Sequence, residues 1–140
     1  MFFSIDARKN AVKRVEKAWG YELWFANDEA NNYCGKIVHI YAGSKFSMHY
    51  HMVKAETLYV LTGKVKVRII NGQTAAVEEG ELFAGEAFEI QPGLPYQLEA
   101  IDGDAQVIET STFHMDCGRV PWAIGTRLDH FIESGDKYEK

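Results

Sequence analysis

The sequence predicts an all-β sandwich or barrel. From Trp19 onward, short apolar runs alternate with turn signals made of glycine, proline, asparagine and aspartate. Several of these runs place apolar side chains at every second position, which is the period of a strand with one face on a core. A hydrophobic content of 46% in 140 residues is enough for one packed core. We therefore expect a single all-β domain.

The first half of the chain contains three clear strand candidates. Residues 12–17 form either a helical turn or a leading strand. Residues 36–42 are an apolar run that stops at Gly43-Ser44, and the segment around residues 47–51 follows. Residues 56–61 are apolar on both alternating faces, as expected for a strand that is covered on both sides.

The second half begins at a turn, Thr62-Gly63. In residues 64–69 the apolar positions are expected to point inward, and Lys64, Lys66 and Arg68 are expected to point to water. Asn71-Gly72 predicts a two-residue hairpin turn, because both positions of that turn must tolerate positive φ.

Three further elements are expected after this hairpin. Phe88 and Ile90 lie on a short strand between two glycine-containing turns. The next strand has one face made of Tyr96, Leu98 and Ala100, and a last long strand runs from about residue 105 to 113. Beyond it, Leu128, Phe131 and Ile132 have the i, i+3, i+4 spacing of a short amphipathic helix.

Composition excludes several function classes. The net charge is -5, and no basic cluster is interleaved with aromatic residues, so nucleic acid and anionic membranes are not expected partners. The N-terminus has no sustained apolar stretch, which predicts neither a signal peptide nor a membrane span and favours the cytoplasm. Cys34 and Cys117 belong to no Cys-x-x-Cys pattern and are expected to be reduced, ordinary thiols.

Two histidines and one carboxylate have the spacing of a metal site. They form the run Gly43, five residues, His49-Tyr50-His51, four residues, Glu56, six residues, Gly63. Residues two apart in a strand point to the same face, so His49 and His51 face one way. Glu56 has an odd offset, so a turn before it must reset the parity and open the next strand beside the first. Two His and a carboxylate with open positions suit non-haem Fe(II), Zn, Mn or Ni.

This run resembles the first motif of the cupin superfamily at every specified position. A second stretch, from Gly85 to Tyr96, resembles the second cupin motif, although Gln91 replaces the usual proline and Tyr96 replaces the expected third histidine ligand. The resemblance covers about residues 19–113. It implies a single-domain cupin, which is an antiparallel jelly-roll barrel with its site in the mouth. Residues 1–18 would be an N-terminal segment, and residues 114–140 an extension that packs on the barrel or on a partner subunit.

Three more residues are candidates for the site. Tyr96 is a fourth ligand, a general acid or an aromatic wall, and we favour the acid or the wall. Glu109 moves protons if it faces the inside of the barrel, although base rates favour a solvated position outside. Lys54 lies in the loop between His51 and Glu56, where it is expected to be exposed, with a substrate anion as the alternative partner. His39, His114 and His130 show no partner spacing and are expected to be structural.

Two terminal patterns point to sugar chemistry. Trp19-Gly20-Tyr21-Glu22 resembles the entry strand of mannose-6-phosphate isomerase-type sugar cupins, and Glu109-Thr-Ser-Thr resembles their closing strand. That resemblance implies a metal-dependent aldose–ketose isomerase for a sugar or sugar phosphate. The reaction needs a group that shuttles a proton between C1 and C2, and Tyr96 or Glu109 is the candidate catalytic residue. Those isomerases commonly have Gln at the position of His49.

Two alternative functions remain open at this point. The same ligand set would serve an Fe(II)-dependent dioxygenase. A non-catalytic cupin that binds a sugar or another small molecule is the other alternative, because Tyr96 replaces a ligand. Cupins of this size are commonly homodimers, and the resemblance implies one here. Fold alone does not choose among these functions.

Overall fold

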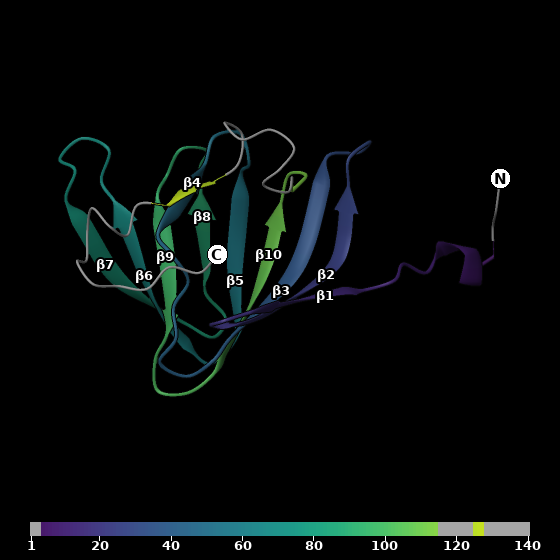
Figure 1. Ribbon diagram of the computed structural model, residues 1–140, viewed down its shortest axis with the longest axis horizontal. Coiled ribbons are helices and arrows are strands. Elements are labelled where there is room, and N and C mark those ends of the chain that lie inside the picture. The colour runs from purple at the N-terminus through teal and green to yellow at the C-terminus, as the bar shows by residue number, and fades with distance from the viewer. Residues whose placement is uncertain (1–3, 115–124, 128–140) are drawn as a thin grey trace.

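The computed structural model describes residues 4–114 and 125–127 of the chain. Its strands form two antiparallel sheets that face each other (Figure 1). One sheet has the order β1-β2-β3-β10-β5-β8, and the other has the order β11-β4-β9-β6-β7. Within the described residues the two sheets are separate ladders, so the sandwich is open and not a closed barrel. The predicted all-β, antiparallel, jelly-roll class is confirmed.

The six-stranded sheet contains the longest antiparallel pairings. The alternative of a leading strand for residues 12–17 is correct, because β1 pairs with β2 from Lys13↔Trp24 to Lys17↔Gly20. A short 3-10 helix, η1 (Asp6–Arg8), precedes β1 and projects away from the sheets in Figure 1. The strands of this sheet are β1 (Lys13–Lys17), β2 (Gly20–Asp28), β3 (Tyr33–Ile40), β10 (Ala105–Ser111), β5 (Glu56–Thr62) and β8 (Ala87–Ile90).

The five-stranded sheet includes two strands that the sequence pattern did not predict, β7 and β11. In β7 the exposed residues Glu78, Glu79 and Glu81 hide any apolar alternation. Charged side chains are typical of an edge strand, because they discourage pairing with another chain. The strands of this sheet are β11 (Gly125–Arg127), β4 (His49–His51), β9 (Tyr96–Ala100), β6 (Lys64–Ile70) and β7 (Val77–Phe83).

The hydrophobic core lies between the two sheets. Alternate positions of the central strands supply it, as the period of two predicts. The predicted face of Tyr96, Leu98 and Ala100 is confirmed, since all three side chains are buried. The other members of the core cluster are Trp19, Val38, Ile40, Phe46, Leu58, Val60, Val65, Val67, Ile90, Ala105 and Val107.

Gly63 carries the chain from one sheet to the other. It separates β5 from β6, and its φ is +82°, a left-handed conformation that L side chains rarely adopt. A Cβ at this position would lie 2.4 Å from the backbone oxygen of Asp104. Both the conformation and the close approach of the backbone therefore require glycine.

The prediction that Arg68 points to water was wrong. Arg68 is only 8% exposed. Its guanidinium donates hydrogen bonds to Gln97 at 3.0 Å and to Glu79 and Glu99 at 2.8 Å each. The two carboxylates come from the strands on either side of β6. A three-strand ion-pair network thus replaces the expected contact with solvent.

The hairpin at Asn71-Gly72 is present, but its predicted two-residue turn is wrong. β6 and β7 pair up to Ile70↔Val77, so six residues connect them. The side-chain oxygen of Asn71 accepts hydrogen bonds from the backbone N–H groups of Gln73 and Thr74, and the positive φ falls on Ala75. The Asn side chain therefore organises a wider loop.

Some predictions lie outside the described residues. These are the helix with Leu128, Phe131 and Ile132, the thiol of Cys117, and His130. Among the described residues, no helix has the length and apolar character needed to span a membrane.

Candidate functional site

His49 and His51 lie together on β4, as their spacing predicts. Their ring centroids are 5.1 Å apart in an edge-to-face arrangement, and both residues are half-buried. The nitrogen Nδ1 of His49 donates to the backbone oxygen of Ser47 at 2.8 Å, because a carbonyl can only accept. This hydrogen bond fixes the orientation of the His49 ring and leaves its proton on Nδ1.

Tyr96 packs directly against this histidine pair. It is the β9 residue opposite His49, its ring centroid is 4.9 Å from that of His49, and it is 4% exposed. Phe46 contacts both rings, at 5.4 and 5.7 Å. Burial, followed by the charge of Glu56, raises the pKa of the Tyr96 phenol well above its usual value. Tyr96 is therefore a neutral phenol in an aromatic wall.

Glu56 does not open a strand beside β4, so that part of the prediction was wrong. β4 belongs to the five-stranded sheet, whereas β5, which begins at Glu56, belongs to the other sheet. The loop of residues 52–55 therefore crosses between sheets. Hydrogen bonds of Ala55 N to Thr112 Oγ1 and of Thr112 N to Ala55 O anchor this loop to the end of β10.

Lys54 is buried, contrary to the expectation of an exposed loop lysine. Its ammonium lies 2.7 Å from Glu109 Oε2, 3.2 Å from Glu56 Oε1 and 3.0 Å from His114 Nδ1. A lysine ammonium has three N–H groups, and three acceptors surround this one. Lys54, Glu56 and Glu109 are 6%, 5% and 6% exposed. The anchored loop turns the Lys54 side chain inward, which its sequence position alone does not reveal.

The Glu109 side chain is also buried between the sheets, although the usual exposure of charged residues had favoured a solvated position. It shares the inward face of β10 with Ala105 and Val107, both fully buried. Burial alone would raise the pKa of this carboxyl, but the charges of Lys54 and Lys36 outweigh burial and hold its pKa well below the usual range. Glu109 is therefore an ionised carboxylate, and it holds Lys54 in its charged form by raising the pKa of the ammonium against the effect of burial.

Glu56 is the group in this cluster with the least complete set of partners. Neither of its carboxylate oxygens accepts a hydrogen bond of good geometry. Lys54 makes an ion-pair contact at 3.2 Å, and the Tyr96 hydroxyl is close enough to affect the pKa of both groups. Burial and the charge of Glu109 raise the pKa of Glu56 to about 7, against the opposing effects of Lys54 and Tyr96. Glu56 can thus hold or release a proton near neutral pH.

His114 belongs to this cluster, although its spacing suggested only a structural role. Its ring lies 6.1 Å from His51 and 5.0 Å from Trp24, and its Nδ1 accepts from Lys54. Burial is the largest cause that lowers the pKa of His51 to about 3 and of His114 to about 2. Both imidazoles are therefore neutral. No sequence signal marked His114, since it lies just beyond the last predicted strand.

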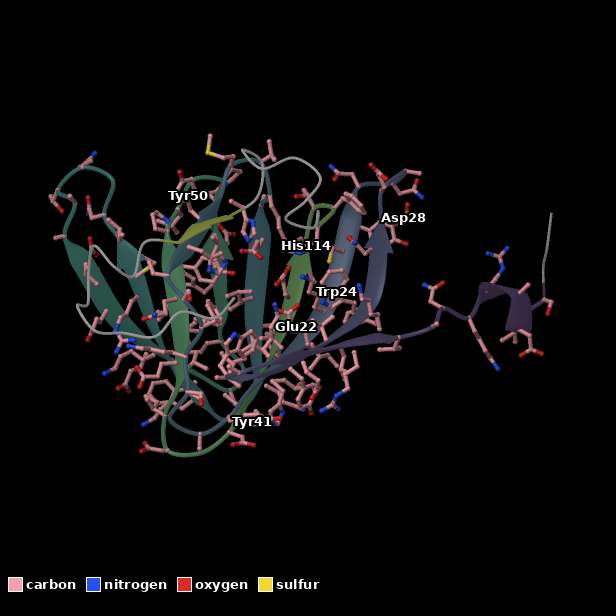
Figure 2. The ribbon with its side chains drawn as sticks, viewed as in Figure 1. Glu22, Trp24, Asp28, Tyr41, Tyr50 and His114 are labelled. Carbon is pink, nitrogen blue, oxygen red and sulfur yellow. The ribbon has the colours of Figure 1, made fainter. Side chains whose placement is uncertain are left out.

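A second buried cation extends the cluster along β2 and β3. Lys36 lies 3.5 Å from Glu22 Oε1 and stands over the Trp24 ring at 4.1 Å, and Trp24 Nε1 donates to the same Glu22 oxygen at 2.7 Å. In Figure 2 the labelled residues Glu22, Trp24 and His114 lie near one another, whereas Tyr50 is labelled further away, on β4. Lys36 shares the inward parity of Val38 and Ile40, which is the signal that sequence reasoning missed.

The described donors do not fit a resident metal ion. In residues 4–114 and 125–127, no three His, Cys, Asp or Glu side chains are arranged to hold one. The Lys54 ammonium lies 3.2 Å from Glu56 Oε1, so a cation on that oxygen would meet a second positive charge. Metal ligation by His49, His51 and Glu56 stays a prediction.

Comparison with known proteins agrees with this architecture. Residues 36–111 match the sequence model of the cupin domain, which is more than half of the chain. The chain belongs to the cupin family. Its fold is shared with the capsular polysaccharide assembling protein CapF from Staphylococcus aureus, at 17% identity and a TM-score of 0.72 over 84% of this cupin and 34% of CapF. A second CapF structure, with the inhibitor 3-isopropenyl-tropolone, has a TM-score of 0.71 at 17% identity over the same shares.

A third similar structure is that of an enzyme with a different name. Oxalate decarboxylase from Bacillus subtilis at pH 4.6 has a TM-score of 0.67 at 15% identity, over 89% of this cupin and 32% of that enzyme. The chain thus spans about a third of the length of the structures it matches. None of the curated proteins matches it. At these identities the likeness establishes the fold, and the chemistry has to be argued from the site.

Proposed function

We propose that this cupin binds a small polyhydroxylated molecule, a sugar or sugar phosphate, between its sheets and interconverts its aldose and ketose forms. The observation that carries the proposal is the cluster of Glu56, Tyr96, Lys54 and Glu109. Buried ionisable groups are costly unless they are paired, and their concentration at one end of a core is typical of functional sites. The sugar class rests on the resemblance of Trp19-Gly20-Tyr21-Glu22 and Glu109-Thr-Ser-Thr to sugar cupins.

The proposed reaction needs one carbon base and one oxygen acid. Glu56 takes the proton from C2 of the aldose, the C–H electron pair forms the C1=C2 bond, and the Tyr96 phenol gives its proton to O1. In the return step Glu56 gives its proton to C1, and the Tyr96 phenolate takes the proton from O2 to leave the ketone. The step is balanced without an outside reactant. A pKa of about 7 suits Glu56 to both halves.

Glu109 has a different role from the one the sequence suggested. Its carboxylate is ionised and is held by Lys54 at 2.7 Å, so it keeps the ammonium in place and does not carry the proton. Glu109 is in this proposal a positioning residue. Trp24 and the histidine pair supply the wall and the polar contacts around the substrate.

The test uses exchange of carbon-bound protons with solvent. Mannose, fructose and their 6-phosphates are incubated in D2O with a chelator, and deuterium at C1 and C2 is followed by proton NMR. We expect exchange with at least one of these probes and a loss of about 10²- to 10⁴-fold in Glu56→Gln. Glu89→Gln, on the exposed face of β8, is the matched control and is expected to retain exchange. Equal rates in Glu56→Gln and the wild type would refute the assignment.

A non-catalytic binding cupin is the second candidate. The arrangement of the described residues favours it, because no three His, Cys, Asp or Glu side chains among them are placed to hold one metal ion. A rise in Tm with a sugar probe, without exchange of any carbon-bound proton, would support binding alone. An oxygen-activating function requires three donors that converge on iron, so we favour proton transfer. A homodimer and a cytoplasmic location also stay predictions.

A further inference from the structure

We infer that the Lys54 ammonium serves as the built-in cation of this site, in the place of a metal ion, and that its removal creates a divalent-metal site. This inference concerns charge and geometry and does not depend on the proposed isomerisation. It follows from the conflict between the predicted ligand set and the contacts of Lys54.

The buried cluster needs a cation to balance the charge of its carboxylates. Glu56 and Glu109 are carboxylates that are each at least 94% buried, and Lys54 is the cation in contact with both. Unpaired buried carboxylates are strongly disfavoured, so some cation has to accompany them. Lys36 makes its ion pair with Glu22 instead. In the described part of the chain, Lys54 is therefore the cation that this pair of carboxylates uses.

The acceptors around the Lys54 ammonium are of the types that also bind metal ions. Two carboxylates and one imidazole surround it, which are the donor types that hold Zn or Fe in metalloproteins. Their distances of 2.7 to 3.2 Å suit hydrogen bonds of an ammonium, whereas metal–ligand bonds are about 2.0 to 2.2 Å long. The three acceptors match the three N–H groups of lysine.

In the sequence, Lys54 lies between the predicted ligands His51 and Glu56. It lies three residues after His51 and two before Glu56, in a loop that is anchored to β10. Its ammonium is in ion-pair contact with Glu56, so a divalent ion on that carboxylate would meet a second positive charge in a buried setting. Coulomb repulsion at such distances is large when water is excluded. Lys54 and the metal thus compete for one place.

The test is metal binding by the purified, untagged protein, with Co(II) as the probe and its visible absorption as the signature of the ligands. Wild type is expected to stay without Co(II). Lys54→Met keeps the length of the side chain but removes its charge, and it is expected to bind one Co(II) per chain, with a Kd at least about a hundredfold lower than that of the wild type. Adding His114→Ala to Lys54→Met removes the imidazole that surrounds the ammonium and should abolish that gain. Lys36→Met is the control and should gain no site.

Two results of the Co(II) measurement would contradict the inference. Stoichiometric Co(II) in the wild type that His51→Ala removes would overturn it, and so would a folded Lys54→Met that binds no Co(II). If Lys54→Met does not fold by circular dichroism, Lys54→Met with Glu109→Gln leaves one carboxylate in place of two and is measured instead. It keeps Glu56 and His114 and is expected to bind Co(II) more tightly than the wild type, and a folded double variant that binds none would overturn the inference. Because no turnover is measured, failure of the isomerase proposal does not change this result.

Discussion

Replacing Lys54 by Met should destabilise this cupin strongly at alkaline pH. The substitution removes one charge and leaves the Glu56 and Glu109 carboxylates, 5% and 6% exposed, without their shared cation. Breaking a buried ion pair by removing one partner costs about 3–5 kcal/mol, because the remaining charge is desolvated and uncompensated. We expect a loss of that size in the free energy of unfolding at pH 8.

The pH dependence of this loss has a defined sign. Without Lys54 the pKa of each carboxyl rises in the folded state, so the folded variant binds protons that the unfolded chain releases. A raised acid pKa contributes stability at low pH that is lost as the pH rises through the folded value. The deficit of Lys54→Met should therefore shrink between pH 8 and pH 6. Addition of Glu109→Gln should recover part of it, since the two positions are coupled.

The assay is urea unfolding followed by tryptophan fluorescence and circular dichroism at both pH values. The midpoint and slope give the free energy of unfolding for wild type, Lys54→Met, Glu109→Gln and the double variant. A loss below about 1 kcal/mol at pH 8, the range of exposed ion pairs, would refute the account of a buried, essential cation.

Two further predictions concern stability. In the folded protein the pKa of His51 is about 3 and that of His114 about 2, both below the unfolded value of 6.5. Each histidine therefore contributes stability that is lost as the pH falls below 6.5, about 2 kcal/mol each by pH 5. The raised pKa of Glu56 has the opposite effect and returns about 2 kcal/mol of stability over the same pH range. In urea titrations, His114→Asn should lose about 2 kcal/mol less than wild type between pH 7 and pH 5, and equal slopes would contradict the neutral His114. Gly63→Ala should cost more than about 2 kcal/mol, because φ is +82° and a Cβ would lie 2.4 Å from Asp104 O. Gly72→Ala, with open space around it, should stay within about 0.5 kcal/mol, and similar losses at both glycines would contradict that reading.

The sequence predicts those parts of the site that depend on strand periodicity. The period of two places His49 beside His51 and buries Tyr96 with Leu98 and Ala100. The same rule applied to Ala105, Val107 and Glu109 would have placed Glu109 inside, because two small or branched apolar residues set the inward face of β10. Base rates for charged residues outweighed that local signal, and the outcome was wrong.

The remaining part of the site depends on contacts between distant segments. Lys54 turns inward because Ala55 and Thr112 tie its loop to β10, 57 residues further along the chain. His114 follows the last strand, where no periodic pattern constrains it. β4 and β5 lie in different sheets because the loop crosses the sandwich, and a loop of four residues is long enough for either route. No rule of local spacing predicts these features.

The most direct test of the central claim is the NMR signal of the Lys54 ammonium. A buried lysine in contact with two carboxylates and one imidazole should show protected N–H protons on its side-chain nitrogen at neutral pH, whereas exposed lysines exchange too fast. We expect one such signal that Lys54→Met removes and that neither a chelator nor added Zn(II) changes. An ammonium with no protection, or a signal lost as Zn(II) binds, would show that the metal, and not Lys54, is the cation of this site.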